Sequence, residues 1–257
     1  MSAPFATAIV HDGVLSLRIA TDDEPHMDLR WSQRLAAALD GIGRDATVRV
    51  VVLEGGARVF CAGASRDALL TRRDVPSEYA AQVSRALLAT PLPIVAALAG
   101  HAIGGGLLVG LWCDAAVLAA ESLYGANFMA LGFTPGMGAT AAVPDAFGPV
   151  LGRRLLFTGQ CLTGREIRAA GCPLSHAVHA RREVRDRAIA LAAEMADAPR
   201  PALVLLKQTL AARRQVTLER ALEAERHDHA ELFADDRTFD EIGRRYLDTD
   251  RLPGTPE

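Results

Sequence analysis

The chain has 257 residues, with 28 basic and 31 acidic side chains and 50% hydrophobic residues. This length suits one large domain with a sizeable core, with or without a helical appendage. The net charge of -3 gives no reason to expect nucleic acid as a partner, and no apolar run is long enough to cross a membrane. The four cysteines lack metal-ligand spacing, so we expect free thiols and no metal site. Because the N-terminus lacks a signal-peptide pattern, we expect a cytoplasmic protein.

Hydrophobic periodicity predicts alternating strands and helices, followed by helices alone. In chain order we expect a hairpin over residues 7–20, a helix over 29–42, a strand over 47–53, a helix over 78–88, a strand over 94–99, a helix opening at 104–106 and a strand over 114–119. Short strands and turns then alternate with helical pieces, and the pattern after about residue 181 is almost wholly helical. This order predicts a layered α/β core over residues 1–195 and a C-terminal helical module over 196–257.

Two segments share one layout, in which a buried strand is followed by a glycine cluster and a helical pattern. They are residues 51–65, VVLEGGARVFCAGAS, and residues 93–114, PIVAALAGHAIGGGLLVGLWCD. Neither has the G-x-G-x-x-G spacing of a dinucleotide site or the G-x-x-x-x-G-K-S/T spacing of a P-loop. Taken alone, a glycine cluster after a strand more often serves a tight turn than a ligand. The two clusters therefore indicate a function only in combination.

In combination, FCAGAS and GHAIGGG resemble two segments of the crotonase (enoyl-CoA hydratase/isomerase) superfamily, F-x-A-G-A-D and G-x-x-x-G-G-G. The similarity continues through Tyr124-Gly125 and the turn TPGMG at residues 134–138, and it covers roughly residues 6–235. The resemblance implies an α/β fold in which ββα units form a crotonase-like spiral, ending in a C-terminal helical module. It also implies an acyl thioester substrate and a homotrimer or hexamer assembled through that module.

Reactions beside a thioester carbonyl pass through an enolate-like anion whose charge gathers on the thioester oxygen. Two converging backbone N–H groups would stabilise this oxygen, and each such donor is typically worth ~3 kcal/mol in the transition state. The resemblance places one donor at Ala64, after Gly63, and the other at Gly105, after Gly104. The glycines would let the backbone approach the substrate, and a helix opening at Gly105 would add the field of its dipole.

Hydratases of this superfamily use two glutamates to position and activate water, at positions where this chain has Leu108 and Phe128. Neither side chain can donate or accept a proton, so we do not expect hydration. We expect both to contact the substrate, together with Asn127, in a dry pocket without fixed negative charge. Such a pocket suits a substrate that brings its own carboxylate and favours the loss of CO2, with the oxyanion hole as the electron sink.

Residues 122–148 contain a longer motif, NFMxxGFTPGMGAT, which runs from Asn127 to Thr140. It resembles the decarboxylating crotonases of polyketide β-branching cassettes. The resemblance implies a lyase that converts a 3-methylglutaconyl group on an acyl carrier protein into a 3-methylcrotonyl group. The carrier's phosphopantetheine is then part of the substrate, and no metal or redox cofactor is expected. The alternatives are a CoA-thioester isomerase, hydrolase or hydratase with relocated groups, and a non-catalytic thioester-binding subunit.

In that family, a tyrosine four residues and a lysine eight residues after the first oxyanion residue lie near the substrate carboxylate. Counted from Ala64, these positions hold Ala68 and Arg72. Arg72 would keep the positive charge and could bind a carboxylate through two hydrogen bonds, but its high pKa makes it unsuitable as a proton donor. The alternative is a solvated arginine on a surface loop.

The family's other catalytic candidate is a C-terminal histidine. In the helical pattern over residues 217–233, His229 shares one face with Leu218, Leu222 and Phe233, whereas His227 points to the opposite side. We therefore expect His229, or a water that it holds, to protonate the γ-carbon of the substrate. The alternative is a structural histidine whose hydrogen bonds are satisfied within the core.

Overall fold

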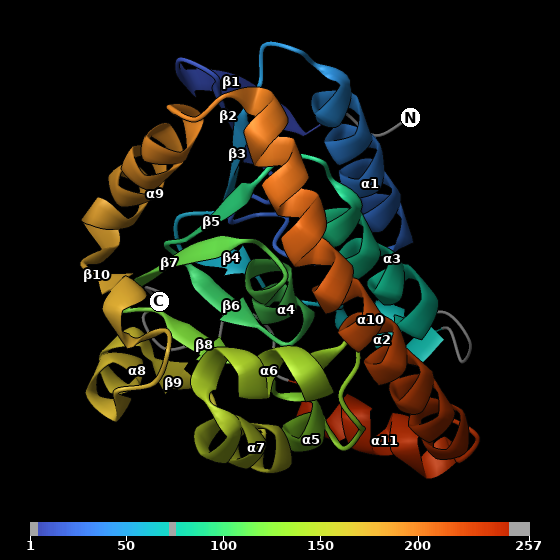
Figure 1. Ribbon diagram of the computed structural model, residues 1–257. Helices are drawn as coiled ribbons and strands as arrows, with labels where there is room; N and C mark the ends of the chain where they lie inside the picture. Colours follow the sequence, from blue (N-terminus) through green and yellow to red (C-terminus); the bar gives the residue numbers. More distant parts are fainter. Residues whose placement is uncertain (1–4, 72–75, 247–257) are drawn as a thin grey trace.

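A six-stranded, mostly parallel sheet forms the centre of the computed structural model, which describes residues 5–71 and 76–246 (Figure 1). In spatial order its strands are β1 Ala6–His11, β2 Val14–Arg18, β3 Val50–Glu54, β5 Ile94–Leu98, β7 Ala115–Ala119 and β10 Val178–His179. β1 and β2 form the predicted antiparallel hairpin, and the other neighbours pair in parallel. β3 begins later than predicted because Asp45 Oδ1 accepts hydrogen bonds from the N–H and hydroxyl groups of Thr47 and holds a turn there.

A second, smaller sheet contains β4 Val59–Cys61, β6 His101–Ile103, β8 Leu123–Gly125 and β9 Leu162–Thr163. Each of the first three strands follows a strand of the large sheet and precedes a helix: β4 precedes α2 Arg66–Thr71, β6 precedes α4 Gly105–Leu111 and β8 precedes α5 Phe128–Leu131. These repeated ββα units form the predicted spiral. Periodicity does not predict β4 or β6, because strands of three residues are too short to show it.

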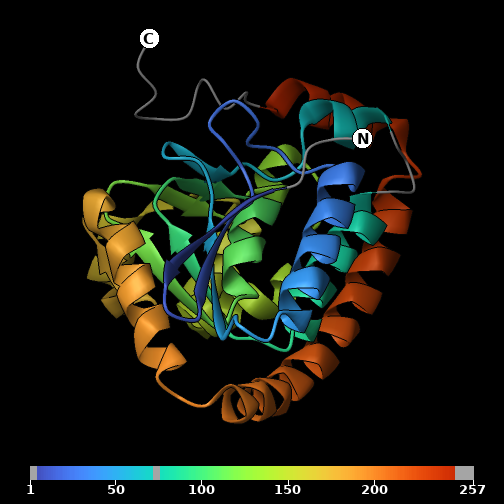
Figure 2. The same ribbon diagram turned by 90° about the horizontal axis from the view of Figure 1, so that it is seen from above.

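Helices cover both faces of the large sheet. On one face, α1 Leu29–Arg44 packs beside α3 Pro76–Ala89, and on the other α9 Arg181–Ala196 packs on β3, β5 and β7. α10 Arg200–Leu232 contacts α3, and with α9 it curves around the outside of the core in Figure 2. Neither α10 nor any other described helix is long and apolar enough to cross a membrane. The remaining helical elements are α6 Ala139–Phe147, α7 Pro149–Thr158, α8 Gly164–Ala170, a 3-10 turn at Ser175–Ala177 and α11 Asp236–Arg245.

The side chains of β3 alternate between two hydrophobic clusters. Val51 and Leu53 join the larger cluster with α1 and α3, whereas Val50 and Val52 belong to the cluster that contains the alanines of α9. Both faces of the strand are therefore buried. This is why its sequence is a continuous apolar run instead of the alternating pattern of a half-exposed strand.

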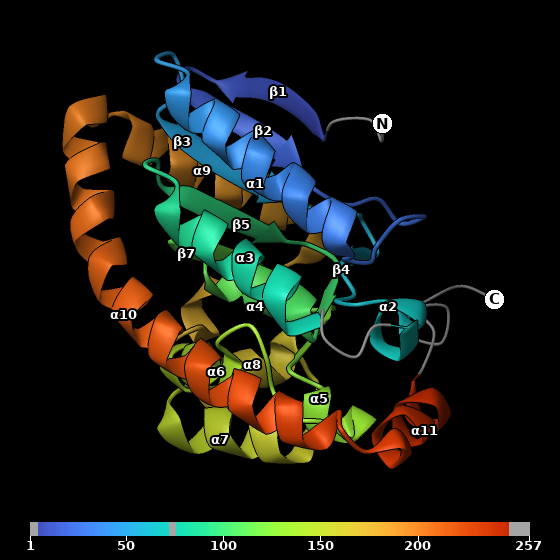
Figure 3. The same cartoon turned by 90° about the vertical axis from the view of Figure 1, so that its right-hand side faces the viewer.

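One ion pair fastens the first half of α10 to the sheet. Lys207, the only lysine in the sequence, is 2% exposed, and its Nζ lies 2.9 and 2.8 Å from the two carboxylate oxygens of Asp114. Asp114 also accepts a hydrogen bond of 2.9 Å from the N–H of Ile94, at the start of β5. The far half of α10 leads to α11, which packs against α2 and α5 (Figure 3). Because α2 follows β4 and α5 follows β8, α11 thereby lies near the smaller sheet.

Candidate active site

A cavity of about 270 Å³ lies between the small sheet, α5 and the C-terminal helices, and its wall is mostly apolar. The structure brings most of the predicted site residues to this cavity: Gly63, Ala64, Gly104, Gly105, Asn127, Phe128 and His229. Arg72 lies outside the described residues. Within the described lining there is no Asp or Glu side chain, so no carboxylate stands ready to activate water.

Backbone atoms of the two glycine segments meet on one wall of the cavity. β4 and β6 pair in parallel and bring Gly63 beside Gly105, so that a Cβ on Gly63 would lie 3.0 Å from the Gly105 nitrogen. Gly63 also has a φ of +75°, which L side chains rarely adopt. No described residue accepts a hydrogen bond from the N–H of Ala64 or of Gly105. The two predicted donors therefore lie in adjacent segments, and both are available to a ligand.

Leu108 differs from the expectation drawn from the sequence. It is fully buried in the main hydrophobic core and does not line the cavity. It belongs to the first turn of α4, where its N–H donates to the carbonyl of Gly104, and the helix turns the side chain into the core. Leu108 therefore stabilises the helix that carries Gly105 and has no direct contact with the cavity.

Phe128 does line the cavity, and it belongs to a chain of aromatic rings. Its ring packs edge-on against Phe133, with 5.7 Å between centroids, and Phe133 in turn contacts His229 and Phe233. Burial raises the pKa of the nearby Cys161 thiol to about 11, so this lining residue is protonated near neutral pH and is a poor nucleophile. The wall is therefore dry and offers no anionic group of its own.

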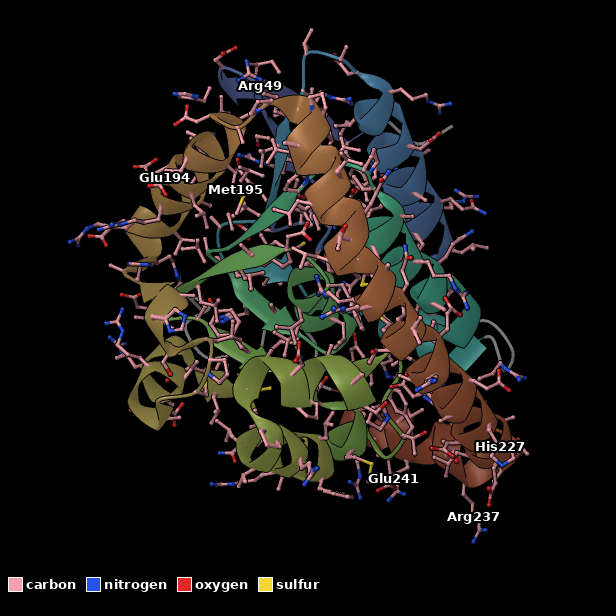
Figure 4. The ribbon with its side chains drawn as sticks, viewed as in Figure 1. Arg49, Glu194, Met195, His227, Arg237 and Glu241 are labelled. Atoms are coloured by element: carbon pink, nitrogen blue, oxygen red, sulfur yellow. The ribbon has the colours of Figure 1, made fainter. Side chains whose placement is uncertain are left out.

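His229 faces the buried side of α10, as predicted, and is 8% exposed, whereas His227 is exposed at the outer edge of the helix (Figure 4). Its Nε2 donates a hydrogen bond of 2.8 Å to the carbonyl of Thr134. Burial lowers the pKa of His229, and the carbonyls of Thr134 and Pro135 oppose this effect only in part. The imidazole is therefore neutral near pH 7, with its Nε2 proton held by a backbone carbonyl.

Glu225, one helical turn before His229, is a residue that sequence reasoning missed. It is 3% exposed and accepts hydrogen bonds from the N–H of Gly138, at 2.7 Å, and from the N–H and hydroxyl of Thr140, at 2.9 and 2.7 Å. Burial raises its pKa, although these three donors act in the opposite direction. Glu225 and His229 thus hold the two ends of the 134–140 turn. A carboxylate on the same helical face as His229 is the signal that could have revealed it.

The end of α11 contributes two further residues that were not predicted, Arg245 and Tyr246. The hydroxyl of Tyr246 donates a hydrogen bond of 2.9 Å to the carbonyl of Ala64, and both residues line the cavity. They lie beyond the motifs recognised in the sequence, which end before residue 236, so no motif identifies them. The only lysine of the chain, Lys207, is paired with Asp114 and does not line the cavity.

The spiral of ββα units, with free backbone donors beside a dry cavity, defines a protein of the crotonase fold. Residues 20–249 match the enoyl-CoA hydratase/isomerase family. The chain belongs to this family.

Two kinds of relative stand out among the similar proteins. The bacillaene synthase decarboxylase PksI of Bacillus subtilis is 35% identical, over 84% of this chain and 88% of that protein. A probable enoyl-CoA hydratase, echA17 of Mycolicibacterium paratuberculosis, is 30% identical over 90% of this chain and 92% of that protein.

Two similar solved structures are, like PksI, described in connection with decarboxylation. An enzyme from a dehydratase/decarboxylase couple involved in polyketide β-branching superposes with a TM-score of 0.87 at 29% identity, covering 95% of this chain and 100% of that chain. The ECH2 decarboxylase domain of CurF from Lyngbya majuscula superposes with a TM-score of 0.85 at 27% identity, with the same coverage. The protein is therefore similar both to decarboxylases of polyketide β-branching and to hydratases.

Proposed function

We propose that the protein is a decarboxylase of polyketide β-branching, which converts a 3-methylglutaconyl-type thioester on an acyl carrier protein into a 3-methylcrotonyl-type thioester. One observation carries this proposal. Ala64 and Gly105, whose N–H groups have no described acceptor, line one cavity whose described lining contains no carboxylate. The site can stabilise an anion on a thioester oxygen, but it lacks the acid–base groups that add water. Similarity to PksI and to the CurF decarboxylase domain supports the same choice.

In the proposed reaction, the thioester oxygen accepts hydrogen bonds from the N–H groups of Ala64 and Gly105. The bond between the γ-carbon and the distal carboxylate breaks, and CO2 leaves. The electron pair of that bond moves through the conjugated chain to the thioester oxygen and gives a dienolate. The γ-carbon then takes up one proton, and the electrons return from the oxygen to form the α,β-unsaturated product. The reaction requires no metal or redox cofactor.

The source of the proton is constrained by the state of His229. Its Nε2 proton is held by the Thr134 carbonyl, and its lowered pKa disfavours a second proton on the ring. If His229 itself donates the proton, its hydrogen bond to the Thr134 carbonyl has to break first. The alternative donor is a water molecule held by the ring. The family resemblance places Arg72 near the distal carboxylate, but the high pKa of an arginine makes it unsuitable as a proton donor.

The apolar lining of the cavity supports decarboxylation for a further reason. The wall around Phe128, Leu131 and Phe133 is apolar, so a carboxylate bound beside it is poorly hydrated. Loss of CO2 removes this poorly solvated charge from the carboxylate and places it on an oxygen that two N–H groups stabilise. Assembly as a homotrimer or hexamer through the helices after residue 196 remains a prediction.

The test is incubation with 3-methylglutaconyl-carrier protein, followed by mass spectrometry of the carrier. We expect the loss of CO2 from the acyl group, and a gain of water in its place would refute the proposal. The rival is a hydratase or isomerase of free CoA esters, which the similarity to echA17 favours. It predicts turnover of 3-methylcrotonyl-CoA to a hydrated or isomerised product, so both thioesters should be offered in parallel.

A further inference from the structure

Among the described residues that line the cavity, Arg245 is the only one with a permanent charge. We propose that Arg245 binds the free carboxylate of the acyl group and thereby selects substrates that carry one. This inference rests on the proposed function, because it names the group that recognises the part of the substrate to be lost. It assigns the role to the end of α11, a segment that the sequence motifs do not reach.

The hydrogen bonds around Arg245 leave its outer nitrogens available. The carboxylate of Glu241 pairs with Arg245 through Nε and with Arg244 through Nη2, so two guanidinium groups share one carboxylate. Nη1 of Arg245 has only a long contact, 3.4 Å, with the carbonyl of Ala130, and Nη2 has no acceptor among the described residues. One positive charge therefore remains uncompensated beside an apolar wall. A guanidinium in this state can bind a carboxylate with its two terminal nitrogens.

Packing fixes the end of α11 that carries this cation, while the Arg245 side chain itself is 50% exposed. A Cβ on Gly132, whose φ is +93°, would lie 2.8 Å from Cγ of Glu241, so the glycine lets α11 press against the end of α5. Figure 4 marks Glu241 at this junction. On the other side, the Tyr246 hydroxyl is bonded to the carbonyl of Ala64 at 2.9 Å. The end of α11 that carries Arg245 thus lies between α5 and the segment that supplies the first backbone donor.

The acyl carboxylate fits this place better than the phosphate of a pantetheine arm, which is the other anion of such a substrate. The acyl chain extends from the thioester that the two N–H groups would bind, and it has to enter the cavity of about 270 Å³. The phosphate lies at the far end of the long arm, away from the thioester. An arginine also leaves the carboxylate ionised, which is the form that loses CO2, because the guanidinium does not give up its proton.

The experiment measures the binding of four unreactive ligands by calorimetry: glutaryl and pentanoyl thioesters, each on pantetheine and on phosphopantetheine. The proteins are the wild type, Arg245→Gln, Arg245→Lys and a matched control, Arg244→Gln. Arg244 shares Glu241 with Arg245 but does not line the cavity. We expect the wild type to prefer glutaryl over pentanoyl, and Arg245→Gln to weaken glutaryl binding by about 10- to 100-fold.

The same change should leave pentanoyl binding intact, which also shows that the variant is folded. Arg245→Lys should keep part of the preference. Arg244→Gln should weaken it far less than Arg245→Gln does, because it leaves the guanidinium of Arg245 in the cavity and only gives Glu241 one partner fewer. Equal glutaryl affinity in the wild type and Arg245→Gln would overturn the inference. So would a loss that follows the phosphate instead of the acyl carboxylate. If the wild type prefers glutaryl but releases no CO2 from 3-methylglutaconyl-carrier protein, the proposed reaction fails while the role of Arg245 stands.

Discussion

The two walls of the cavity are built in different ways. The first wall, which we call the glycine wall, consists of backbone atoms from the segments around Gly63 and Gly105, held together by the pairing of β4 with β6. The second, the C-terminal wall, consists of the 134–140 turn, the α10 side chains that fix it, and the end of α11 with Arg245 and Tyr246. The glycine wall depends on the absence of side chains, whereas the C-terminal wall depends on particular side chains far along the chain.

This difference separates the roles of the two walls. A backbone N–H does not depend on which side chain its residue carries, so the glycine wall can serve any reaction that passes through an enolate-like anion. The C-terminal wall supplies the histidine and the cation, so we expect it to decide which thioester reacts and how. Changes in the glycine wall should therefore damage folding and all binding together. Changes in the C-terminal wall should be more selective.

The largest effect is expected from Gly106→Ala in the glycine wall. A Cβ at this position would overlap the carbonyl of Cys61, which is backbone and cannot move aside. We expect a loss of about 3 kcal/mol in the free energy of unfolding, measured by urea denaturation. The matched control is Gly41→Ala in α1, where a Cβ meets nothing within 4 Å. That variant should be neutral or slightly more stable, by up to about 1 kcal/mol. Similar destabilisation in both variants would show that the close approach of Gly106 to Cys61 does not explain the loss of stability.

The next effect is expected from Glu225→Ala in the C-terminal wall. The change leaves the N–H groups of Gly138 and Thr140 without their acceptor in a buried place. We expect a cost of about 2 kcal/mol in stability and a clear fall in turnover, because the turn it holds lines the cavity. Glu223→Ala is the control, since Glu223 is exposed on the same helix and pairs only with Arg226. Wild-type turnover in Glu225→Ala would mean that the turn keeps its shape without the carboxylate.

The same division explains what the sequence predicts and what it does not. Gly63 and Gly105 are predictable because short motifs specify backbone shape, and His229 because the helical period places it on an apolar face. Leu108 occupies the position of a catalytic glutamate of the family, but its side chain lies in the core. Spacing along a helix does not show which residues line a cavity. Arg245 and Tyr246 reach the cavity through contacts that span 115 and 182 positions in the chain. No local pattern in the sequence encodes such contacts.

Tyr246→Phe removes a hydrogen bond that joins the end of α11 to the glycine wall. The ring keeps its packing, so we expect a loss of only about 1 kcal/mol in stability. The informative measurement is hydrogen exchange of the backbone amides around Ala64, which should become faster in the variant. Unchanged exchange there would show that the two walls are held independently, and that the glycine wall needs no support from α11.

The smallest effect is the pH dependence contributed by His229. Its pKa is lowered in the folded protein by burial, so the unfolded chain binds the proton more tightly. The contribution of this residue to stability is therefore fully present above its unfolded pKa of about 6.5, and it is lost as the pH falls through that value towards the folded pKa. His229→Gln keeps an N–H that can donate to the Thr134 carbonyl but does not titrate, so its stability should fall less steeply between about pH 7 and 5.

Glu225 acts in the opposite sense, because its raised pKa favours the folded protein below about pH 4.5 and this advantage is lost as the pH rises. Two titrating groups of opposite sign on α10 therefore give the C-terminal wall a pH response, and identical pH profiles for the wild type and His229→Gln would contradict this prediction.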